Sequence, residues 1–129
     1  MNGALRALTG GYSFAGNKFN RATQAKRQPG SSFKPFVYAA SFERGFNPAS
    51  IVLDAPVVFR DRRGNTWSPQ NDDRRFSGQV MLVDALTRSM NVPTVNLGMS
   101  LGLPAITDTW QKLGVPKDQL NAVPAMILG

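Results

Sequence analysis

Ser31 and Lys34 are the first residues in this chain whose types and spacing could do chemistry together. The sequence contains no histidine and no cysteine, so a serine nucleophile needs another base, and lysine is the usual substitute. Residues i and i+3 share one face of a helix, so the Lys34 amine can reach the Ser31 hydroxyl. Ser32 has no such partner, because Pro35 occupies its i+3 position. The alternative interpretation is a serine that caps a helix and a lysine that faces solvent.

Ser89 and Asn91 form a second candidate pair. A hydroxyl at position 89 could relay protons, and the uncharged amide of Asn91 could hold the backbone of a substrate. Taken alone, the motifs S-x-x-K and S-x-N are both close to chance. The alternative for the second pair is an ordinary turn at the end of a helix, with Asn91 as the stop.

Composition bounds what else the chain can do. Of its 129 residues, 42% are hydrophobic, which fits one small domain or a piece of a larger one. The absence of cysteine and histidine excludes disulfides, thiol catalysis and nearly all zinc or haem sites, so we expect no metal and no cofactor. No apolar run approaches the roughly 20 residues of a membrane span, and the first residues lack the apolar core of a signal peptide.

The net charge of +7 lies in the first half of the chain. Residues 1–64 hold ten basic and three acidic residues, and the remainder is neutral. A basic half attracts anions such as nucleic acid, acidic membranes or substrates with carboxylates. Tyr12, Phe14 and Phe19 are interleaved with Lys18 and Arg21, as in modules that bind single-stranded nucleic acid. Such a module is one alternative function, beside a solvated basic face over core phenylalanines.

The first 45 residues predict two strands, a loop and a helix. Residues 4–8 and 12–19 are short apolar stretches separated by glycines, so they predict the two strands of a hairpin. Residues 20–30 are polar and basic and predict a loop. The apolar spacing of residues 33, 36, 37 and 40 predicts a helix that starts at Ser31 or Ser32 and stops at Gly45.

The later residues predict one strand and three helices. Residues 55–59 are of β type and precede a polar turn at 61–65, and residues 67–78 are irregular. Helices are expected over 80–90, 94–101 and 104–113. A break is expected at 91–93, because the residue before Pro93 avoids helical geometry. The apolar residues Met126, Ile127 and Leu128 come last and would have nothing to bury them, which predicts a truncated chain.

Longer stretches around both motifs resemble a known family. The motif SSFK at 31–34 lies in residues 10–40, which resemble the catalytic-serine region of class A (bifunctional) penicillin-binding proteins of the 1a type. The motif SMN at 89–91 lies in residues 67–120, which are similar to the 1b type. The resemblance therefore changes subtype near residue 60, as an unfamiliar lineage, a recombinant or a designed chimera would each produce.

The resemblance implies a fold of α+β class: the N-terminal half of a penicillin-binding or serine β-lactamase-like transpeptidase domain. This half, residues 1–129, would be helix-rich with a few antiparallel strands and would lack the later sheet strands. The family's third motif, K-T/S-G, occurs nowhere in the chain. A glycosyltransferase domain and a membrane anchor, expected upstream in class A members, are also absent from it.

The resemblance also implies roles for the four residues. Ser31 would form an acyl-enzyme with a D-Ala-D-Ala stem peptide of peptidoglycan, with Lys34 as its base. Ser89 would pass a proton to the departing amine, and Asn91 would hydrogen-bond the peptide. β-Lactam antibiotics would acylate the same serine. The parent family works at the cell envelope, in the periplasm, and a complementary chain could supply the K-T/S-G strand.

Two further interpretations stay open beside this one. A β-lactamase shares the first two motifs but commonly needs a glutamate to activate water. The only glutamate is Glu43, three turns beyond Ser31 on the same helix, which favours acyl transfer to an amine over hydrolysis. The other is a structural remnant without catalysis, which folds only with its missing half. With the third motif absent, we expect little activity from this chain alone and no nucleic acid as its partner.

Overall fold

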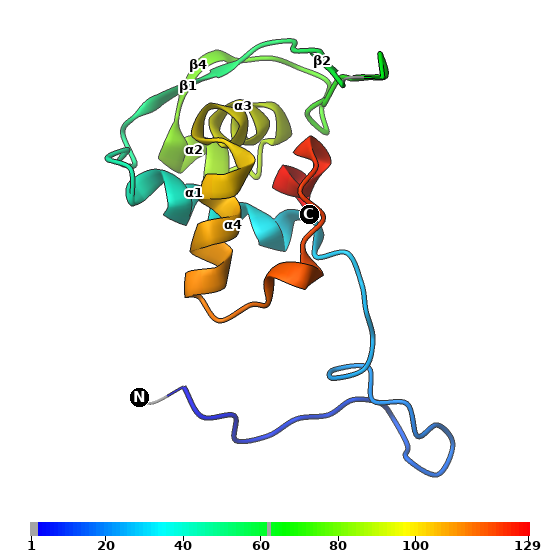
Figure 1. Cartoon of the computed structure of the whole chain (residues 1–129). Coiled ribbons are helices and arrows are strands. Elements are labelled where there is room, and N and C mark those ends of the chain that lie inside the picture. Colours follow the sequence, from blue (N-terminus) through cyan, green and yellow to red (C-terminus); the bar gives the residue numbers. More distant parts are fainter. Residues whose placement is uncertain (1–2, 62) are drawn as a thin grey trace.

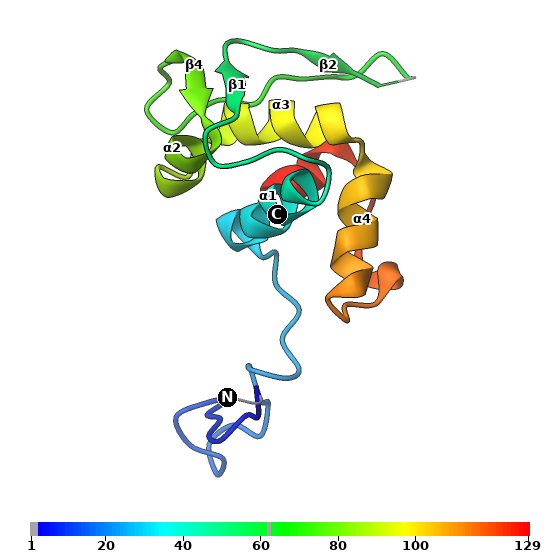
Figure 2. The same ribbon diagram turned by 90° about the vertical axis from the view of Figure 1, so that its left-hand side faces the viewer.

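The N-terminal segment leads away from the rest of the molecule. The computed structural model describes residues 3–61 and 63–129, and both views show residues 3–29 extending from a helical body (Figure 1, Figure 2). The strands predicted at 4–8 and 12–19 are wrong, because no strand forms in residues 3–29. A two-stranded hairpin is marginal without an apolar face to pack on, and the side chains of Tyr12 and Phe14 are exposed. The loop predicted from residue 20 onward is confirmed.

The predicted helix after this segment is present, with a different start. A 3-10 turn, η1 (Gly30–Phe33), runs directly into α1 (Lys34–Phe42). Neither Ser31 nor Ser32 caps it; the Ser32 hydroxyl instead donates to the carbonyl of Pro29. The apolar face is buried as the spacing predicts, and the helix ends just before Gly45, which has a positive φ of 91°.

Two short antiparallel strand pairs lie beside the helices. β1 (Ile51–Asp54) pairs with β4 (Gly78–Met81), and β2 (Phe59–Arg60) pairs with β3 (Thr66–Trp67). The strand predicted at 55–59 is therefore mostly wrong: β1 ends before a proline, which cannot donate to a ladder. The turn predicted at 61–65 is confirmed in the described residues, and Arg62 lies outside them.

Three helices follow in close succession. They are α2 (Leu82–Thr87), α3 (Asn91–Leu101) and α4 (Leu103–Lys112). The helix predicted over 80–90 is shorter than expected, because its first two residues belong to β4. The break predicted at 91–93 is wrong in place: these residues form the first turn of α3, where Pro93 is tolerated because first-turn N–H groups have no helical partner.

Helix α3 lies at the centre of the body (Figure 2). It contacts α1, β1, α4 and the C-terminal turn η3 (Pro124–Leu128), which follows the short turn η2 (Lys117–Gln119). A Cβ at Gly98 would lie 2.7 Å from Ile127, so α3 and η3 touch through this glycine. Met126 and Ile127 are buried. The expectation that the final apolar residues have nothing to bury them is therefore wrong.

Candidate active site

Lys34 is the centre of a polar cluster. Its side chain, at the first position of α1, is 1% exposed. The amine donates to the Ser89 carbonyl at 2.6 Å, to the Ser89 hydroxyl at 3.1 Å and to Asn91 Oδ1 at 2.6 Å. A lysine ammonium has three N–H groups. All three are engaged, so the fold binds the charged form of Lys34 with groups from the α2–α3 junction.

Burial lowers the pKa of Lys34 below its ordinary value, because the charged amine has lost most of its water. The Asp72 carboxylate acts in the opposite direction and raises this pKa. The first effect is the larger. A neutral amine is therefore easier to form here than on a surface lysine.

Ser89 follows the C-cap of α2 in a strained conformation. Its φ is 51°, the left-handed region that glycine or asparagine usually occupies after a helix. The backbone N–H groups of Ser89 and Met90 donate to the carbonyls of Leu86 and Ala85, at 2.9 and 2.8 Å, the pattern of a Schellman motif. The serine carbonyl and hydroxyl of this turn both contact the Lys34 amine. The strained turn thus supplies two of the three acceptors of the amine.

Asn91 is the first residue of α3, and the nitrogen of its side-chain amide donates two hydrogen bonds. Nδ2 donates to the Gln70 carbonyl at 3.0 Å and to Asp72 Oδ1 at 3.1 Å. Its oxygen accepts from Lys34. The amide thus connects the buried amine to the segment between β3 and β4.

Asn71 and Asp54 form a buried second layer that sequence reasoning missed. Asn71 Oδ1 accepts the backbone N–H groups of Asn91 and Val92, both at 3.1 Å, and so caps α3. Asn71 Nδ2 donates to Asp54 Oδ1 at 2.7 Å. The other Asp54 oxygen accepts the backbone N–H of Ser77 at 2.8 Å. In the sequence Asn71 is one polar residue of an irregular stretch, and no spacing marks it as a partner of Asn91.

Ser31 lies one turn before Lys34 but outside the hydrogen-bonded cluster. It is in η1, and its side chain is exposed. In the part of the chain that the structure describes, no hydrogen bond joins its hydroxyl to Lys34, Ser89 or Asn91. Three of the four predicted site residues are therefore bonded together, and the fourth, Ser31, is an exposed residue one turn before Lys34.

Glu43 lies at the opposite end of α1 from this cluster. Its carboxylate accepts a hydrogen bond from Thr109 at 2.8 Å and pairs with Lys112 at 3.5 Å, both on α4. These contacts give Glu43 a structural role between two helices.

Comparison with known proteins identifies the family. The family model "Penicillin binding protein transpeptidase domain" matches residues 1–126. The chain belongs to the penicillin-binding protein transpeptidase family. It is 60% identical to Penicillin-binding protein 1B of Escherichia coli over 100% of the chain, and 43% identical to Penicillin-binding protein 1A of Pseudomonas aeruginosa over 99%. In each case it spans only 16% of the relative's length.

The solved structures confirm the fold of this penicillin-binding transpeptidase segment. The crystal structure of Penicillin-Binding Protein 1A from Haemophilus influenzae matches with a TM-score of 0.90 and 36% identity, over 94% of this chain and 18% of that one. The predicted α+β class, helix-rich with a few antiparallel strands, is confirmed. The identities are averaged over the whole chain, so the change of subtype near residue 60 stays a prediction. No helix among the described residues has the length and apolarity to cross a membrane.

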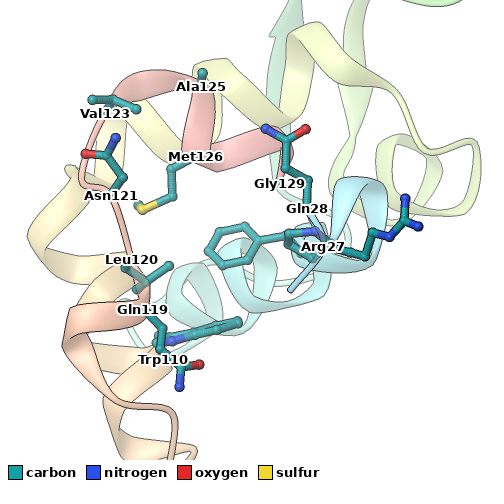
Figure 3. Close-up of a pocket in the computed structure, with 12 residues that line it drawn as sticks. Arg27, Gln28, Trp110, Gln119, Leu120, Asn121, Val123, Ala125, Met126 and Gly129 are labelled. Carbon is teal, nitrogen blue, oxygen red and sulfur yellow. The ribbon is translucent and has the colours of Figure 1, made fainter. Parts of the chain in front are cut away.

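A separate cavity is lined in part by Phe33 of η1. Its volume is about 460 Å³, and its lining combines apolar side chains, among them Phe33, Trp110 and Met126, with polar ones from residues 27, 28, 119 and 121. Figure 3 shows Leu120 and Asn121 on one side of it and Arg27 and Gln28 on the other. Lys34, Ser89 and Asn91 do not line it. In residues 3–61 and 63–129, no three acidic side chains converge as metal ligands.

Proposed function

We propose that this chain carries the serine-acylating part of a peptidoglycan D,D-transpeptidase. Ser31 is the nucleophile, Lys34 its base, Ser89 the proton relay, and Asn91 the group that binds the substrate backbone. The observation that carries the proposal is the buried Lys34 amine, 2.6 Å from Asn91 Oδ1 and 3.1 Å from the Ser89 hydroxyl. The family match supports it.

In the first step the Ser31 oxygen attacks the carbonyl carbon of the penultimate D-alanine. The bond from this carbon to the terminal D-alanine nitrogen breaks, and an ester to Ser31 forms. The Ser31 proton passes to Lys34 and then, through the Ser89 hydroxyl, to the departing amine. A second stem peptide then attacks the ester with its own amine: a new amide bond forms, the ester bond to Ser31 breaks, and a proton of the amine passes by way of Lys34 to the Ser31 oxygen. A β-lactam acylates Ser31 in the same way, with its ring C–N bond as the one that breaks.

Lys34 must lose a proton before it can act as a base, and the hydrogen bonds indicate which contact changes. A neutral amine has two N–H groups and one lone pair. The two shorter bonds, both 2.6 Å, go to oxygens that can only accept, the Ser89 carbonyl and Asn91 Oδ1. The third contact, at 3.1 Å, is the longest and goes to a hydroxyl, so it is the one that opens when Lys34 is neutral and leaves the lone pair to the Ser31 proton. Once Lys34 holds that proton, the Ser89 hydroxyl can accept from it again and pass the proton on.

The rest of the transpeptidase domain would complete the site. In the proposal, a K-T/S-G strand from the remainder of the protein or from a complementary chain supplies the missing oxyanion donor and the group that binds the substrate carboxylate. Loss of one such donor elsewhere costs on the order of 10²–10³ in rate. The reaction would take place in the cell envelope, on the periplasmic side. We therefore expect weak acylation by the 129-residue chain.

Covalent labelling tests the proposal directly. The chain is incubated with a fluorescent penicillin, digested, and the labelled peptide is identified by mass spectrometry. We expect a slow adduct on Ser31 that Ser31→Ala abolishes. Ser32→Ala is the matched control, because Ser32 is the exposed neighbour in the same turn, and it should label like wild type.

A full-length relative into which Ser31→Ala and Ser32→Ala are introduced at the corresponding positions separates a weak segment from a wrong assignment. The label must then disappear with the first substitution and persist with the second. A label that survives Ser31→Ala in both contexts removes Ser31 from its role and refutes the proposal.

A further inference from the structure

The orientation of the Asn91 amide is determined by charged groups on both of its sides. Its oxygen faces the Lys34 ammonium at 2.6 Å, and its nitrogen faces the Asp72 carboxylate at 3.1 Å. A flipped amide would direct its N–H groups at the ammonium and its oxygen at the carboxylate. Both contacts would then be repulsive. One orientation is therefore strongly preferred.

Asp72 is the half of this arrangement that can be removed without changing the backbone. The second acceptor of Asn91 Nδ2, at 3.0 Å, is the main-chain carbonyl of Gln70, which any substitution at position 70 retains. Asp72 is exposed and reaches Asn91 from the segment between β3 and β4. Its carboxylate accepts from Asn91, whereas the buried Asp54 carboxylate accepts from both Asn71 and the backbone N–H of Ser77.

We propose that Asp72 is a positioning residue of this site: its carboxylate holds the Asn91 amide with the nitrogen outward and the oxygen on the Lys34 amine. Asp72 does not touch the reacting atoms. It acts through Asn91, and its charge acts on Lys34 across the amide. The inference rests on the proposed acyl transfer only for its effect on rate, because the contacts exist whether or not the segment reacts.

The other charged side chains near the cluster have hydrogen-bond partners of their own or are exposed. Asp54 bonds to Asn71 and to the N–H of Ser77, and Asp73 accepts the backbone N–H of Arg75 at 2.9 Å. Arg74, Arg75 and Arg88 are exposed. Among the described residues, Asp72 is the charged group that shifts the pKa of Lys34, which it raises. Asp73 is therefore a matched control: an adjacent exposed carboxylate with the same charge.

Nuclear magnetic resonance of the 129-residue chain tests this role without any activity. The lysine ¹³Cε and ¹⁵Nζ signals are titrated in wild type, Asp72→Asn, Asp72→Ala and Asp73→Asn, with Lys34 assigned from a Lys34→Arg sample. The Lys34 midpoint is expected at lower pH in both Asp72 variants and unchanged in Asp73→Asn. Solvent exchange of the Asn91 side-chain NH₂ should be about fivefold faster in Asp72→Ala, which loses one hydrogen bond. Asp72→Asn retains an acceptor oxygen and should exchange nearly like wild type.

Two results would overturn the role of Asp72. One is a Lys34 midpoint that is the same in wild type and Asp72→Asn. The other is an equal shift in Asp73→Asn, which would mean that net charge and not position matters. Where wild type reacts with fluorescent penicillin, the rising limb of its rate against pH should move to lower pH in Asp72→Asn. Failure of wild type to react refutes the proposed function alone, because the titration and exchange measurements still decide on Asp72.

Discussion

Ser89→Gly is expected to give a more stable chain than Ser89→Ala. Both substitutions remove the hydroxyl that accepts from Lys34 at 3.1 Å, and both keep the carbonyl that accepts at 2.6 Å. They differ in the backbone. With φ at 51°, residue 89 is in the left-handed region, where a side chain costs about 1–2 kcal/mol relative to glycine. The difference between the two variants therefore isolates the strain of this turn.

The magnitudes follow from two opposing contributions. Loss of the hydroxyl removes one longer hydrogen bond, about 1 kcal/mol. Glycine recovers at least about 1 kcal/mol of strain, so Ser89→Gly should lie within about 1 kcal/mol of wild type. Alanine recovers none, so Ser89→Ala should lie about 1 kcal/mol below wild type. Under the proposed mechanism both variants lack the relay hydroxyl, so both should acylate more slowly than wild type.

Urea unfolding, followed by circular dichroism and tryptophan fluorescence, measures this order. Ser100 in α3 is the matched control, because it is an exposed helical serine. There glycine should be about 1 kcal/mol less stable than alanine, the reverse order. A Ser89→Gly midpoint at or below that of Ser89→Ala, with equal m values, would show that the turn is unstrained and would refute the reasoning.

Three further outcomes follow from contacts in the same body. Asn71→Asp places a second carboxylate against the buried Asp54, so urea unfolding should give a free energy of unfolding about 2–4 kcal/mol lower than that of wild type. Adding Asp54→Asn to the same chain should restore part of this stability. Gly98→Ala places a methyl group 2.7–2.9 Å from Ile127 and should lower the free energy of unfolding by about 1–3 kcal/mol in the same assay. The decrease should be smaller when Ile127→Val is added. Lys34 has a lowered pKa in the folded chain, so the unfolded chain binds more protons. The free energy of unfolding, measured relative to Lys34→Met, should therefore rise with pH in the interval below the ordinary lysine value of 10.5.

The elements that the sequence predicts well are those with local signals. The helix at 34–42 has apolar residues at helical spacing, and α4 lies between glycines with φ of 84° and 88°. The strand pairs are different. β1 and β4 have four residues each and pair although more than twenty residues separate them in the sequence. The tendency of a segment to form a strand depends on such a partner, which its own residues do not specify. The predicted hairpin of residues 4–8 and 12–19 had local signals but no surface to pack on.

The site could be predicted only as far as its motifs extend. Ser31, Lys34, Ser89 and Asn91 stand in short patterns that the family resemblance made specific. Asn71 could not be found in this way, because an asparagine in a polar stretch is typical of turns. Its role depends on an amide that meets two N–H groups of a helix twenty residues later. Long-range hydrogen bonds of this kind leave no period in the sequence.

Because the hydrogen bonds of Lys34 are also long-range, the pKa of Lys34 reports whether the chain has folded. Its three acceptors lie 55 and 57 residues away in the sequence, so the amine is buried only when α1, the α2–α3 junction and the segment around Asp72 have assembled. In an unfolded chain the amine meets only water and must titrate at the ordinary lysine value. A lowered pKa of Lys34 in the 129-residue chain would therefore show that this part of the transpeptidase domain assembles by itself. An ordinary value would mean that this amine is not buried by residues 1–129 alone.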